Sequence, residues 1–459
     1  MRLPTPFASA HPIAALLLGA LWLWGAAGLS AADYPKAAEN GSLRLTVEGV
    51  RVAPNFGDNA APAGRQWCVV RGRWENRIDK KRAAERGLAT ALDVSDLAKH
   101  LYLVVDGASL GALQQLDGVG GRSSLAAVAI EKPGAFVVGE MVFEIPAGAY
   151  TSAELRYYDD ISGHFRLALT GAPPEAKPLG AVVRNAIAEF AVFAVRDPAP
   201  AAGDTAVPVG SRAVAIELRA RSVWRNSGPA PEYDFSLPAG AQVERVNLVD
   251  WPGTRQSFVL VSDGEYAATP VGGTLPDDAR FLPELFTGGT LVFHVPAEAK
   301  SLELIGTLGR AATEAGVMDF APVRLPVRGG AAKPAPWTMP LRLTDEMFTV
   351  AVGARRVASF AGEPAGEDRE FVVLDVGVEN TGGGGEYFQP EAQLQLVDAE
   401  GGLTNCDEIT GRGPRSPGAQ LYVPAGERRR CELVFRVAKG ASPKINFRGG
   451  SFEAQHELP

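Results

Sequence analysis

One pentapeptide in this chain has the spacing of a catalytic serine motif. Gly107-Ala108-Ser109-Leu110-Gly111 matches G-x-S-x-G and follows the apolar run LYLVVD at 101–106. In an α/β hydrolase this turn exposes a nucleophilic serine above the N-terminus of a helix. The surroundings here lack alternating helices, and the two turns that align with it, at 263–265 and 398–400, carry no serine. We therefore expect a hairpin turn. Ser109 is a candidate nucleophile only under the alternative that the protein is a secreted hydrolase.

A second cluster combines residue types that bind metals. Tyr157-Tyr158-Asp159-Asp160 is followed by His164, and transition metals prefer imidazole together with carboxylate. No second pair of ligands stands at a fixed spacing, so we expect a turn at the end of a strand, with solvated acids. Asp58, Asp106 and Asp159 offer oxygens for Ca²⁺ but lack D-x-D-x-D spacing. The sequence thus predicts no catalytic residue, no metal ligand and no cofactor.

The chain has three cysteines, and two of them are candidates for a disulfide. Cys431 begins a predicted strand on its inward face, and Cys406 lies in the loop before it. A protein sent to an oxidising compartment forms disulfides readily. We predict a Cys406–Cys431 disulfide, with two buried free thiols as the alternative. Cys68 shares parity with apolar neighbours, so we expect a buried free thiol there.

Two short basic runs, Arg428-Arg429-Arg430 and Lys80-Lys81-Arg82, have acids beside them. Such runs are normally solvated surface. An anionic partner, such as a lipid headgroup or a polysaccharide, is the alternative.

These residues belong to a chain whose strongest pattern is a repeated strand. GEMVFEIP at 139–146, GTLVFHVP at 289–296 and CELVFRVA at 431–438 recur at domain-sized intervals. Alternate positions in a strand face the same way, so Phe143, Phe293 and Phe435 face inward. Glu144, His294 and Arg436 are on the opposite, solvent-facing side, as expected of an antiparallel sandwich.

Three similar units contain these strands. Each unit has the order strand, Pro-Ala-Gly turn, strand, Asp/Gly turn and VF strand. Gly (52) and Pro (34) make up almost a fifth of the chain, and apolar runs of four to eight residues end at turn residues, which is an all-β signature. We predict three tandem immunoglobulin-like β-sandwiches. They are a first domain at 41–196, a second domain at 209–328 and a third domain at 338–459, joined by linkers at 197–208 and 329–337.

The third unit resembles the small immunoglobulin-like domains of unknown function found in exported bacterial proteins. The resemblance depends on the strand ending in Glu379-Asn380, on Leu-Val-Asp at 396–398, and on Val-Pro-Ala-Gly-Glu at 423–427 before LVFRV. It covers most of the third unit, part of the first and little of the second. Many relatives follow a lipoprotein signal, and this chain departs from that. The resemblance implies an extracytoplasmic sandwich and has no catalytic residue to transfer.

The first unit carries an insertion at 77–100 that is longer than the corresponding part of the third unit. It has helical pieces broken near Gly87, so we expect either a cap over an open sheet edge or a recognition element. Trp337, in the second predicted linker, is either an exposed anchor or a plug between modules.

The first 32 residues predict export. Arg2 precedes an uncharged apolar run from Ile13 to Leu29, and Ser30-Ala31-Ala32 forms a small-residue cleavage site before Asp33. An uncleaved N-terminal anchor is the alternative. No later segment has the length and apolarity of a membrane span, and the net charge of −8 argues against a nucleic-acid partner.

Together these features predict a secreted or periplasmic cell-envelope protein that binds or organises other molecules without catalysis. The expected partner is a protein or a surface polysaccharide. A secreted hydrolase of unrecognised type and an envelope assembly subunit are the alternatives.

Overall fold

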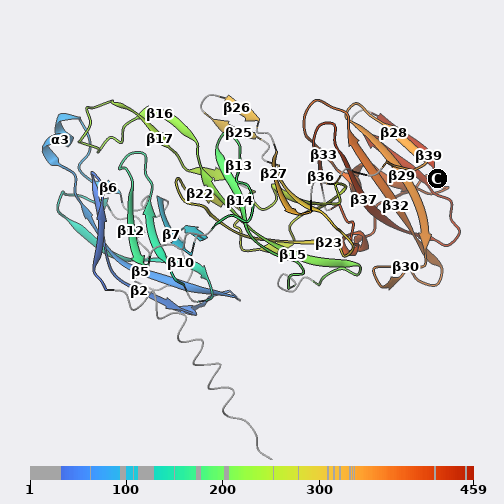
Figure 1. The fold of residues 1–459 in the computed structure, drawn as a ribbon, viewed down its shortest axis with the longest axis horizontal. Coiled ribbons are helices and arrows are strands. Elements are labelled where there is room, and N and C mark those ends of the chain that lie inside the picture. Colours follow the sequence, from blue (N-terminus) through green and yellow to red (C-terminus); the bar gives the residue numbers. More distant parts are fainter. Residues whose placement is uncertain are drawn as a thin grey trace, which may run out of the picture. The chain divides into compact units, whose positions relative to one another are not determined.

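The structure is a computed structural model, and it describes residues 33–62, 64–93, 100–106, 108–111, 129–148, 150–171, 177–200, 206–251, 253–277, 279–307, 310–313, 316–319, 322–329, 332, 334, 336–417, 420–449 and 452–459. The export signal predicted for residues 1–32 lies outside these residues, as does the part of the insertion at 94–99. The described residues are mostly strands (Figure 1). No helix among them has the length and apolarity of a membrane span.

The chain divides into two compact units, which are described separately. The first unit contains the residues up to Ala176 together with Arg225–Leu248, and the second contains Lys177–Trp224 and Val249–Pro459. The segment Arg225–Leu248, which we assigned to the second domain from the sequence, therefore belongs to the first unit.

The first unit contains one set of eight strands in two sheets. One sheet has the order β1-β2-β5-β10, and the other has the order β12-β11-β7-β8. The strands are Lys36–Glu39 (β1), Leu43–Ala53 (β2), Arg65–Asn76 (β5), Leu101–Val105 (β7), Ala108–Gly111 (β8), Phe136–Pro146 (β10), Ala153–Tyr157 (β11) and Phe165–Thr170 (β12). One apolar cluster includes Trp74 and Phe143 from the first sheet and Leu155 from the second, so the two sheets form a sandwich.

The second unit repeats this strand order twice. Its first set pairs β13-β14-β15-β23 in one sheet and β27-β24-β19-β20 in the other, and its second set pairs β28-β29-β32-β37 and β39-β38-β34-β35. The strands of the first of these sets are Val183–Arg184 (β13), Ala188–Arg196 (β14), Ser211–Ser222 (β15), Phe258–Ser262 (β19), Tyr266–Ala268 (β20), Thr287–Pro296 (β23), Leu302–Gly306 (β24) and Val323–Arg328 (β27). The strands of the other set are Leu341–Thr344 (β28), Phe348–Val357 (β29), Arg369–Asn380 (β32), Leu394–Val397 (β34), Leu403–Thr404 (β35), Arg428–Ala438 (β37), Lys444–Gly449 (β38) and Phe452–Glu457 (β39). We call the three sets the first, second and third strand sets, in chain order.

The remaining helices and strands of the described residues are short and lie outside the eight-strand pattern. They are the strands Asn55–Phe56 (β3), Asn59–Ala60 (β4), Leu92–Asp93 (β6), Ala129–Ile130 (β9), Arg225–Pro229 (β16), Gln242–Val246 (β17), Val249–Trp251 (β18), Gly272–Gly273 (β21), Ala279–Phe281 (β22), Arg310–Thr313 (β25), Gly316–Asp319 (β26), Ser359–Phe360 (β30), Glu363–Pro364 (β31), Glu386–Phe388 (β33) and Leu421–Val423 (β36), the helices Lys80–Glu85 (α3) and Pro390–Gln393 (α4), and the 3₁₀ helix Glu408–Arg412.

The inward orientation predicted for the repeated strands is correct. Phe143, Phe293 and Phe435 are 0% exposed. They lie opposite Cys68, Val214 and Val372, which gives all three sets one common register. The other face of these strands is less exposed to solvent than expected. Val142 and Val434 on that face are also buried, each in a small apolar cluster beside a short hairpin.

The first predicted domain boundary differs from the structure. Strand β14 pairs with β15 along nearly its whole length, so 188–196 belongs with 211–222 in one sheet of the second set. The stretch at 197–208 therefore connects two neighbouring strands and does not join two domains. Its Pro-rich composition indicated a linker, but a connection between paired strands has the same turn chemistry.

The second and third strand sets are continuous with each other. Strand β20 pairs in parallel with β37 through Tyr266 and Arg430, which joins two four-stranded sheets into one of eight strands. Val259 and Ile305 of the second set also lie in the same apolar cluster as the core of the third. The segment 329–337 therefore connects two sandwiches that already share a sheet and a core cluster.

Candidate binding pocket on the first strand set

Alternation along two neighbouring strands places a row of polar side chains on one outward face. In β2, Leu43, Leu45 and Val47 are 0% exposed and face the core. Residues between them face the other way because successive side chains in a strand point to opposite sides. The register sets Arg44 opposite Glu75 and Thr46 opposite Arg73.

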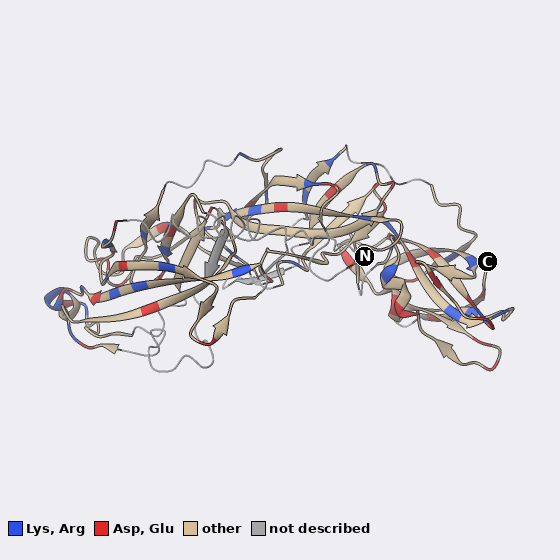
Figure 2. Cartoon of the chain, turned by 90° about the horizontal axis from the view of Figure 1, so that it is seen from below, with Lys and Arg blue, Asp and Glu red and all other residues tan. Residues whose placement is uncertain are grey.

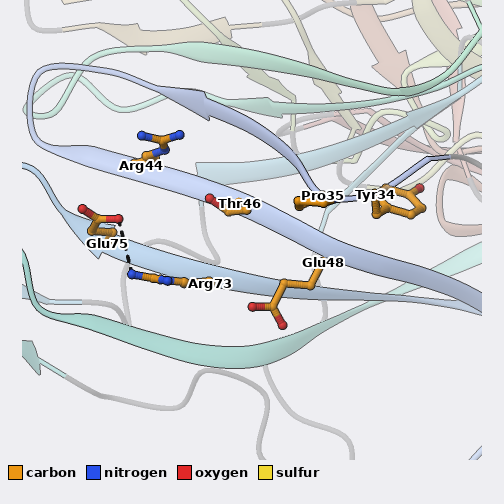
Figure 3. Close-up of a pocket in the computed structure, with 7 residues that line it drawn as sticks. All are labelled: Tyr34, Pro35, Arg44, Thr46, Glu48, Arg73 and Glu75. Carbon is orange, nitrogen blue, oxygen red and sulfur yellow. Dashed lines mark ion pairs between the residues drawn. The ribbon is translucent and has the colours of Figure 1, made fainter.

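These outward residues line an open pocket of about 520 Å³ (Figure 3). Its lining residues are Tyr34, Pro35, Arg44, Thr46, Glu48, Arg73 and Glu75. Glu48 lies at a break in register between Val47 and Gly49, where β2 carries one extra residue relative to β5. A β-bulge of this kind redirects a side chain locally, and here it contributes a carboxylate to the pocket wall.

The charged groups of the pocket are partly paired with one another and with their neighbours. Arg73 lies 3.8 Å from Glu75, and Arg71 lies 3.1 Å from Glu48. Arg44 lies 3.8 Å from Glu39. These side chains are partly exposed, so each pair contributes little to stability. A polar group of a ligand can therefore replace one partner in such a pair.

Arg73 has one donor that is not used within the described residues. Its Nε is buried and has no hydrogen-bond partner there. The guanidinium lies 3.7 Å from the ring centroid of Phe136, a side chain that is 52% exposed. A cation over an aromatic face is attracted by the ring quadrupole, so Phe136 holds the Arg73 guanidinium flat beside the pocket.

The pocket is lined by hydroxyl, guanidinium and carboxylate groups. Its hydroxyl groups belong to Thr46 and Tyr34, and burial raises the pKa of Tyr34 to about 12, which keeps the phenol neutral. The lining contains no His, Cys or Ser to form a nucleophile–base pair. It offers two guanidinium groups and two carboxylates, which recognise polar groups through paired hydrogen bonds.

Ser109 does not lie on a nucleophile elbow. It belongs to β8, where it pairs with Val104 of β7 in an antiparallel hairpin. A nucleophile elbow needs a strand followed directly by a helix, and the strand geometry of 108–111 excludes this. The hairpin predicted from the sequence is therefore correct.

The Tyr157–His164 cluster forms a closed turn. The Tyr157 hydroxyl donates to Asp159 Oδ2 at 2.9 Å, and the Asp159 N–H donates to His164 Nδ1 at 3.3 Å. Burial alone would raise the pKa of Asp159, but hydrogen bonds from Ile161, Ser162 and Tyr157 outweigh it and lower the pKa. Burial also lowers the pKa of His164. These groups satisfy one another, as in a structural turn.

Two of the aspartates weighed as Ca²⁺ ligands, Asp106 and Asp159, are hydrogen-bonded within turns. Asp106 accepts hydrogen bonds from both the backbone and the hydroxyl groups of Thr151 and Ser152, at 2.8–3.1 Å. Asp263, at the same place in the second set, accepts from the N–H groups of Lys300 and Ser301 at 2.9 Å. Within the described ranges, no group of three or more His, Cys, Asp or Glu is placed to hold a metal ion.

All three cysteines are free thiols in this structure. Cys431 is buried in the core of the third set, and Cys406 packs at the edge of the same apolar cluster. The disulfide predicted between them is not formed here, and its formation in the exported protein stays a prediction. Cys68 is buried in the core of the first set, and burial raises its pKa to about 12.

The basic run Arg428-Arg429-Arg430 is not solvated surface, contrary to our expectation. Arg429 is 3% exposed and lies 2.8 Å from Glu427, and burial lowers its pKa to about 10. The Arg430 Nε donates to Asp375 at 2.7 Å. These arginines are within the shared sheet of the second unit, whereas Lys80, Lys81 and Arg82 are exposed.

Trp337 and the insertion at 77–100 both contact other parts of the chain. Trp337 lies over Gly377 of β32, and its ring is 5.0 Å from the Arg428 guanidinium, so it packs on the third set. A role as a plug between modules stays a prediction. In the insertion, Arg86 lies 5.0 Å from the Phe235 ring and donates to the Glu232 carbonyl at 2.9 Å. The insertion thus contacts the segment Arg225–Leu248 inside the first unit.

Sequence reasoning missed the pocket. Its signal was present in the alternation of RLTVE at 44–48 and of RGRWE at 71–75, where polar or charged residues stand at every second position. Finding it required knowing that these two strands are neighbours in register. Figure 2 shows acidic and basic residues on many of the described strands, so charged residues alone do not single out one face.

No protein-family model and no curated protein matches the chain. Among solved structures, the chain is similar to an uncharacterized β-sandwich protein from Clostridium difficile 630, at 8% identity and a TM-score of 0.20. The similarity covers 28% of this chain and 100% of that protein.

Proposed function

We propose that this chain is an exported, non-catalytic binding protein of the cell envelope or the extracellular space, built from three tandem immunoglobulin-like β-sandwiches. The export pattern of residues 1–32 supports the location. The binding role is supported by the pocket of the first strand set.

The strand order supports the immunoglobulin-like assignment. Within each set, the second, third and sixth strands are neighbours, and the other sheet has the order eighth, seventh, fourth, fifth. This corresponds to strands A, B and E facing G, F, C and C′ of an immunoglobulin sandwich. The sets lack a strand D in this order and add a strand before A.

The observation that carries the binding role is the open, charge-lined pocket on the face of β2 and β5 (Figure 3). A ligand site needs a concave surface and a few convergent polar groups. The pocket has both, and five of its seven lining residues lie on β2 and β5. Strands hold a recognition surface more firmly than loops do.

A site-specific photo-crosslinker tests this function. A photo-reactive residue in place of Thr46 should give a discrete crosslinked product in cells that export the protein. The matched control is the same residue in place of Arg342, an exposed strand position of the third set, which should give none. Equal products at both positions, or no product at Thr46, would contradict the proposal.

An envelope assembly subunit is the second candidate, and the β20–β37 pairing favours it. This pairing shows that one sandwich of this chain accepts the edge strand of another, and strand addition at a sheet edge is a common assembly mode. Light scattering of the purified protein distinguishes the candidates, because a monomer at micromolar concentration supports the binding role over assembly.

A further inference from the structure

The segment Arg225–Leu248 forms an arm whose strands pair only with each other. β16 and β17 make a two-stranded sheet, and in the described part of the chain no other strand joins it. Residues 225–227 of this ribbon are exposed. The chain leaves the strands of the second set at one end of the ribbon and returns to them at its other end. An isolated two-stranded ribbon is only marginally stable, so contacts made by its loop must help to hold the arm in place.

The loop between β16 and β17, residues 230–241, is held in shape by its own hydrogen bonds. We call this loop the tip. The Ala230 N–H donates to the Ala241 carbonyl at 2.7 Å and closes its base. The Asp234 N–H donates to the Pro231 carbonyl at 2.9 Å, and the Ser236 N–H donates to Asp234 Oδ1 at 3.0 Å. The tip is therefore preorganised, which lowers the entropy lost when it binds a surface.

Tyr233 of the tip belongs to the core of the first strand set. It is 7% exposed and lies in the same apolar cluster as the strands of that set. Its hydroxyl donates to the Ala89 carbonyl at 2.9 Å, and its N–H donates to the Ile161 carbonyl at 3.3 Å. A Cβ on Gly41 would collide with the Tyr233 carbonyl oxygen, so the close approach of the two chains requires glycine there.

Two arginines of the insertion bind the main chain of the tip. Arg82 donates to the Phe235 carbonyl at 3.0 Å, and Arg86 donates to the carbonyls of Glu232 and Asp234 at 2.9 and 3.3 Å. The Arg86 guanidinium also lies 5.0 Å from the Phe235 ring, as in a cation–π contact. These contacts favour a recognition element over an edge cap for the insertion. We call the groups that receive the tip the seat; they belong to Gly41, Arg82, Arg86, Ala89 and Ile161.

We propose that the tip is exchangeable, so that the arm of one copy of the chain occupies the seat of a second copy. The seat recognises one aromatic side chain and several carbonyls of a loop with its own shape, and none of these contacts needs the covalent link between the arm and its own first strand set. An exchanged dimer repeats every contact of the monomer, which makes exchange of an identical element an inexpensive route to dimers. This inference goes beyond the binding role of the pocket and does not depend on it.

Complementation between two variants tests the exchange. Gly41→Ala blocks the seat and leaves its own tip unbound, whereas Tyr233→Ala leaves its own seat empty. Each variant alone should be a monomer by light scattering, and an equimolar mixture should form a one-to-one heterodimer. Circular dichroism and thermal melting establish that both variants are folded. A mixture of the folded variants that stays monomeric would overturn the proposal.

A matched glycine variant is the control. A Cβ on Gly49 meets no atom of the described residues within 4 Å, so Gly49→Ala keeps its tip in its own seat. Mixed with Tyr233→Ala, it should give at least about tenfold less heterodimer than Gly41→Ala does, because only a small fraction of its tips is free. Equal amounts of heterodimer would show that the released tip is not what joins the copies, and the exchange would be wrong.

A peptide tests recognition by the seat directly. The probe has the sequence of residues 229–241, PAPEYDFSLPAGA, and the control peptide carries alanine in place of its tyrosine. The probe should bind Tyr233→Ala with saturation and bind the wild type at least about tenfold more weakly, because the wild-type tip occupies the seat. Equal binding of the two peptides, or equal binding of the probe to both proteins, would contradict the proposed seat.

The wild-type chain gives a measurement that does not depend on the folding of Tyr233→Ala. Two wild-type preparations with different affinity tags are unfolded in urea with reductant and refolded together at high protein concentration. A fraction should copurify as mixed dimers, and two Gly41→Ala preparations treated in the same way should not. Wild-type protein that refolds only to monomers, or Gly41→Ala protein that copurifies equally well, would overturn the exchange.

Discussion

Asn76 and Asn380 make the same three hydrogen bonds in two different sandwiches. Each is 0% exposed and ends the third strand of its set. Asn76 Nδ2 donates to the carbonyls of Thr90 and Ile130 at 2.7 and 2.9 Å, and its Oδ1 accepts from the Ile78 N–H at 3.0 Å.

Asn380 repeats this arrangement. Its Nδ2 donates to the carbonyls of Gly384 and Val423 at 2.8 Å, and its Oδ1 accepts from the Gly382 N–H at 2.8 Å. Each asparagine thus ties the loop after its strand to a strand of a short two-stranded sheet, β9 of the β6–β9 pair or β36 of the β33–β36 pair. This explains the Glu-Asn signature shared by the first and third sets. Ser222 has the same register position in the second set and is also buried.

Replacing Asn380 by alanine should destabilise the second unit. The change leaves two carbonyls and one N–H without their partner in the interior, so we expect a loss of about 2–3 kcal/mol in the free energy of unfolding. Urea unfolding followed by circular dichroism measures it. Asn405→Ala, at an exposed position, is the control and should change stability by less than about 0.5 kcal/mol. An Asn380→Ala protein as stable as the control would show that the shared hydrogen bonds are incidental.

Phe435→Ala tests the core of the third set. The side chain is 0% exposed, and truncating a buried phenylalanine costs about 3–5 kcal/mol in lost burial and cavity formation. Denaturant melts measure the loss, with Leu403→Ala, which is 53% exposed, as the control. A loss below about 1 kcal/mol would be incompatible with an inward Phe435.

Arg430→Ala should loosen the junction between the second and third strand sets. Its Nε donates to Asp375 at 2.7 Å, and its Nη1 lies 3.5 Å from Glu265, whose side chain is 8% exposed. Hydrogen bonding to Asp375 raises the pKa of Arg430, so the guanidinium is charged at every working pH. Removing it takes a hydrogen-bonded guanidinium away from Asp375 and Glu265, and we expect a loss of about 2 kcal/mol.

Limited proteolysis gives a local readout of the same change. Cleavage within 329–337 should be several-fold faster in Arg430→Ala than in the wild type. The exposed-arginine variant Arg448→Ala serves as the control. Unchanged cleavage in both variants would mean that the shared sheet holds without this ion pair.

Asp197 should make the second unit sensitive to acid. Burial would raise its pKa, but hydrogen bonds and charge from Arg212 and Arg328 outweigh this and lower the pKa below its ordinary value. A carboxyl whose pKa is depressed on folding stabilises the protein above its unfolded pKa of about 3.9, and the stabilisation is lost as the pH falls through the folded value. Thermal melting from pH 7 to pH 2 should therefore show a stability gap between wild type and Asp197→Asn that is present at pH 7 and narrows below about pH 4. A gap that is independent of pH would contradict this role, and Asp277→Asn, at an exposed ion pair, is the control.

The predicted disulfide can be tested by counting thiols. Burial raises the pKa of Cys68 to about 12 and that of Cys406 to about 11, and it raises the pKa of Cys431 as well. All three thiols of the reduced, folded protein should therefore react slowly with iodoacetamide at pH 8. For protein exported to an oxidising compartment and unfolded without reductant, we expect one reactive thiol, and three after reduction. Three reactive thiols without reductant would exclude the Cys406–Cys431 disulfide.

Local pattern was sufficient to predict the repeated VF strands of the three sets and the inward face of each. Period-two alternation identified the inward phenylalanines, since side-chain orientation in a strand depends only on position. The repeated register also aligned Cys68 with Val372, and both lie opposite a buried phenylalanine. The second set was harder to align because Ser222 replaces the asparagine and because β16 and β17 extend the chain between its third and fourth strands.

The sequence by itself determined the β class, the repetition and the inward faces, because these follow from the order of apolar and polar residues along each strand. Only the tertiary structure decided which strands are neighbours, and with it the boundary near 177, the eight-stranded sheet through Tyr266 and Arg430, and the buried state of Arg429. The pocket belongs to the same category, because Arg44 and Glu75 are far apart in the chain and meet only through the pairing of β2 with β5. Pairing between distant strands depends on contacts across the whole sandwich, which no local pattern encodes.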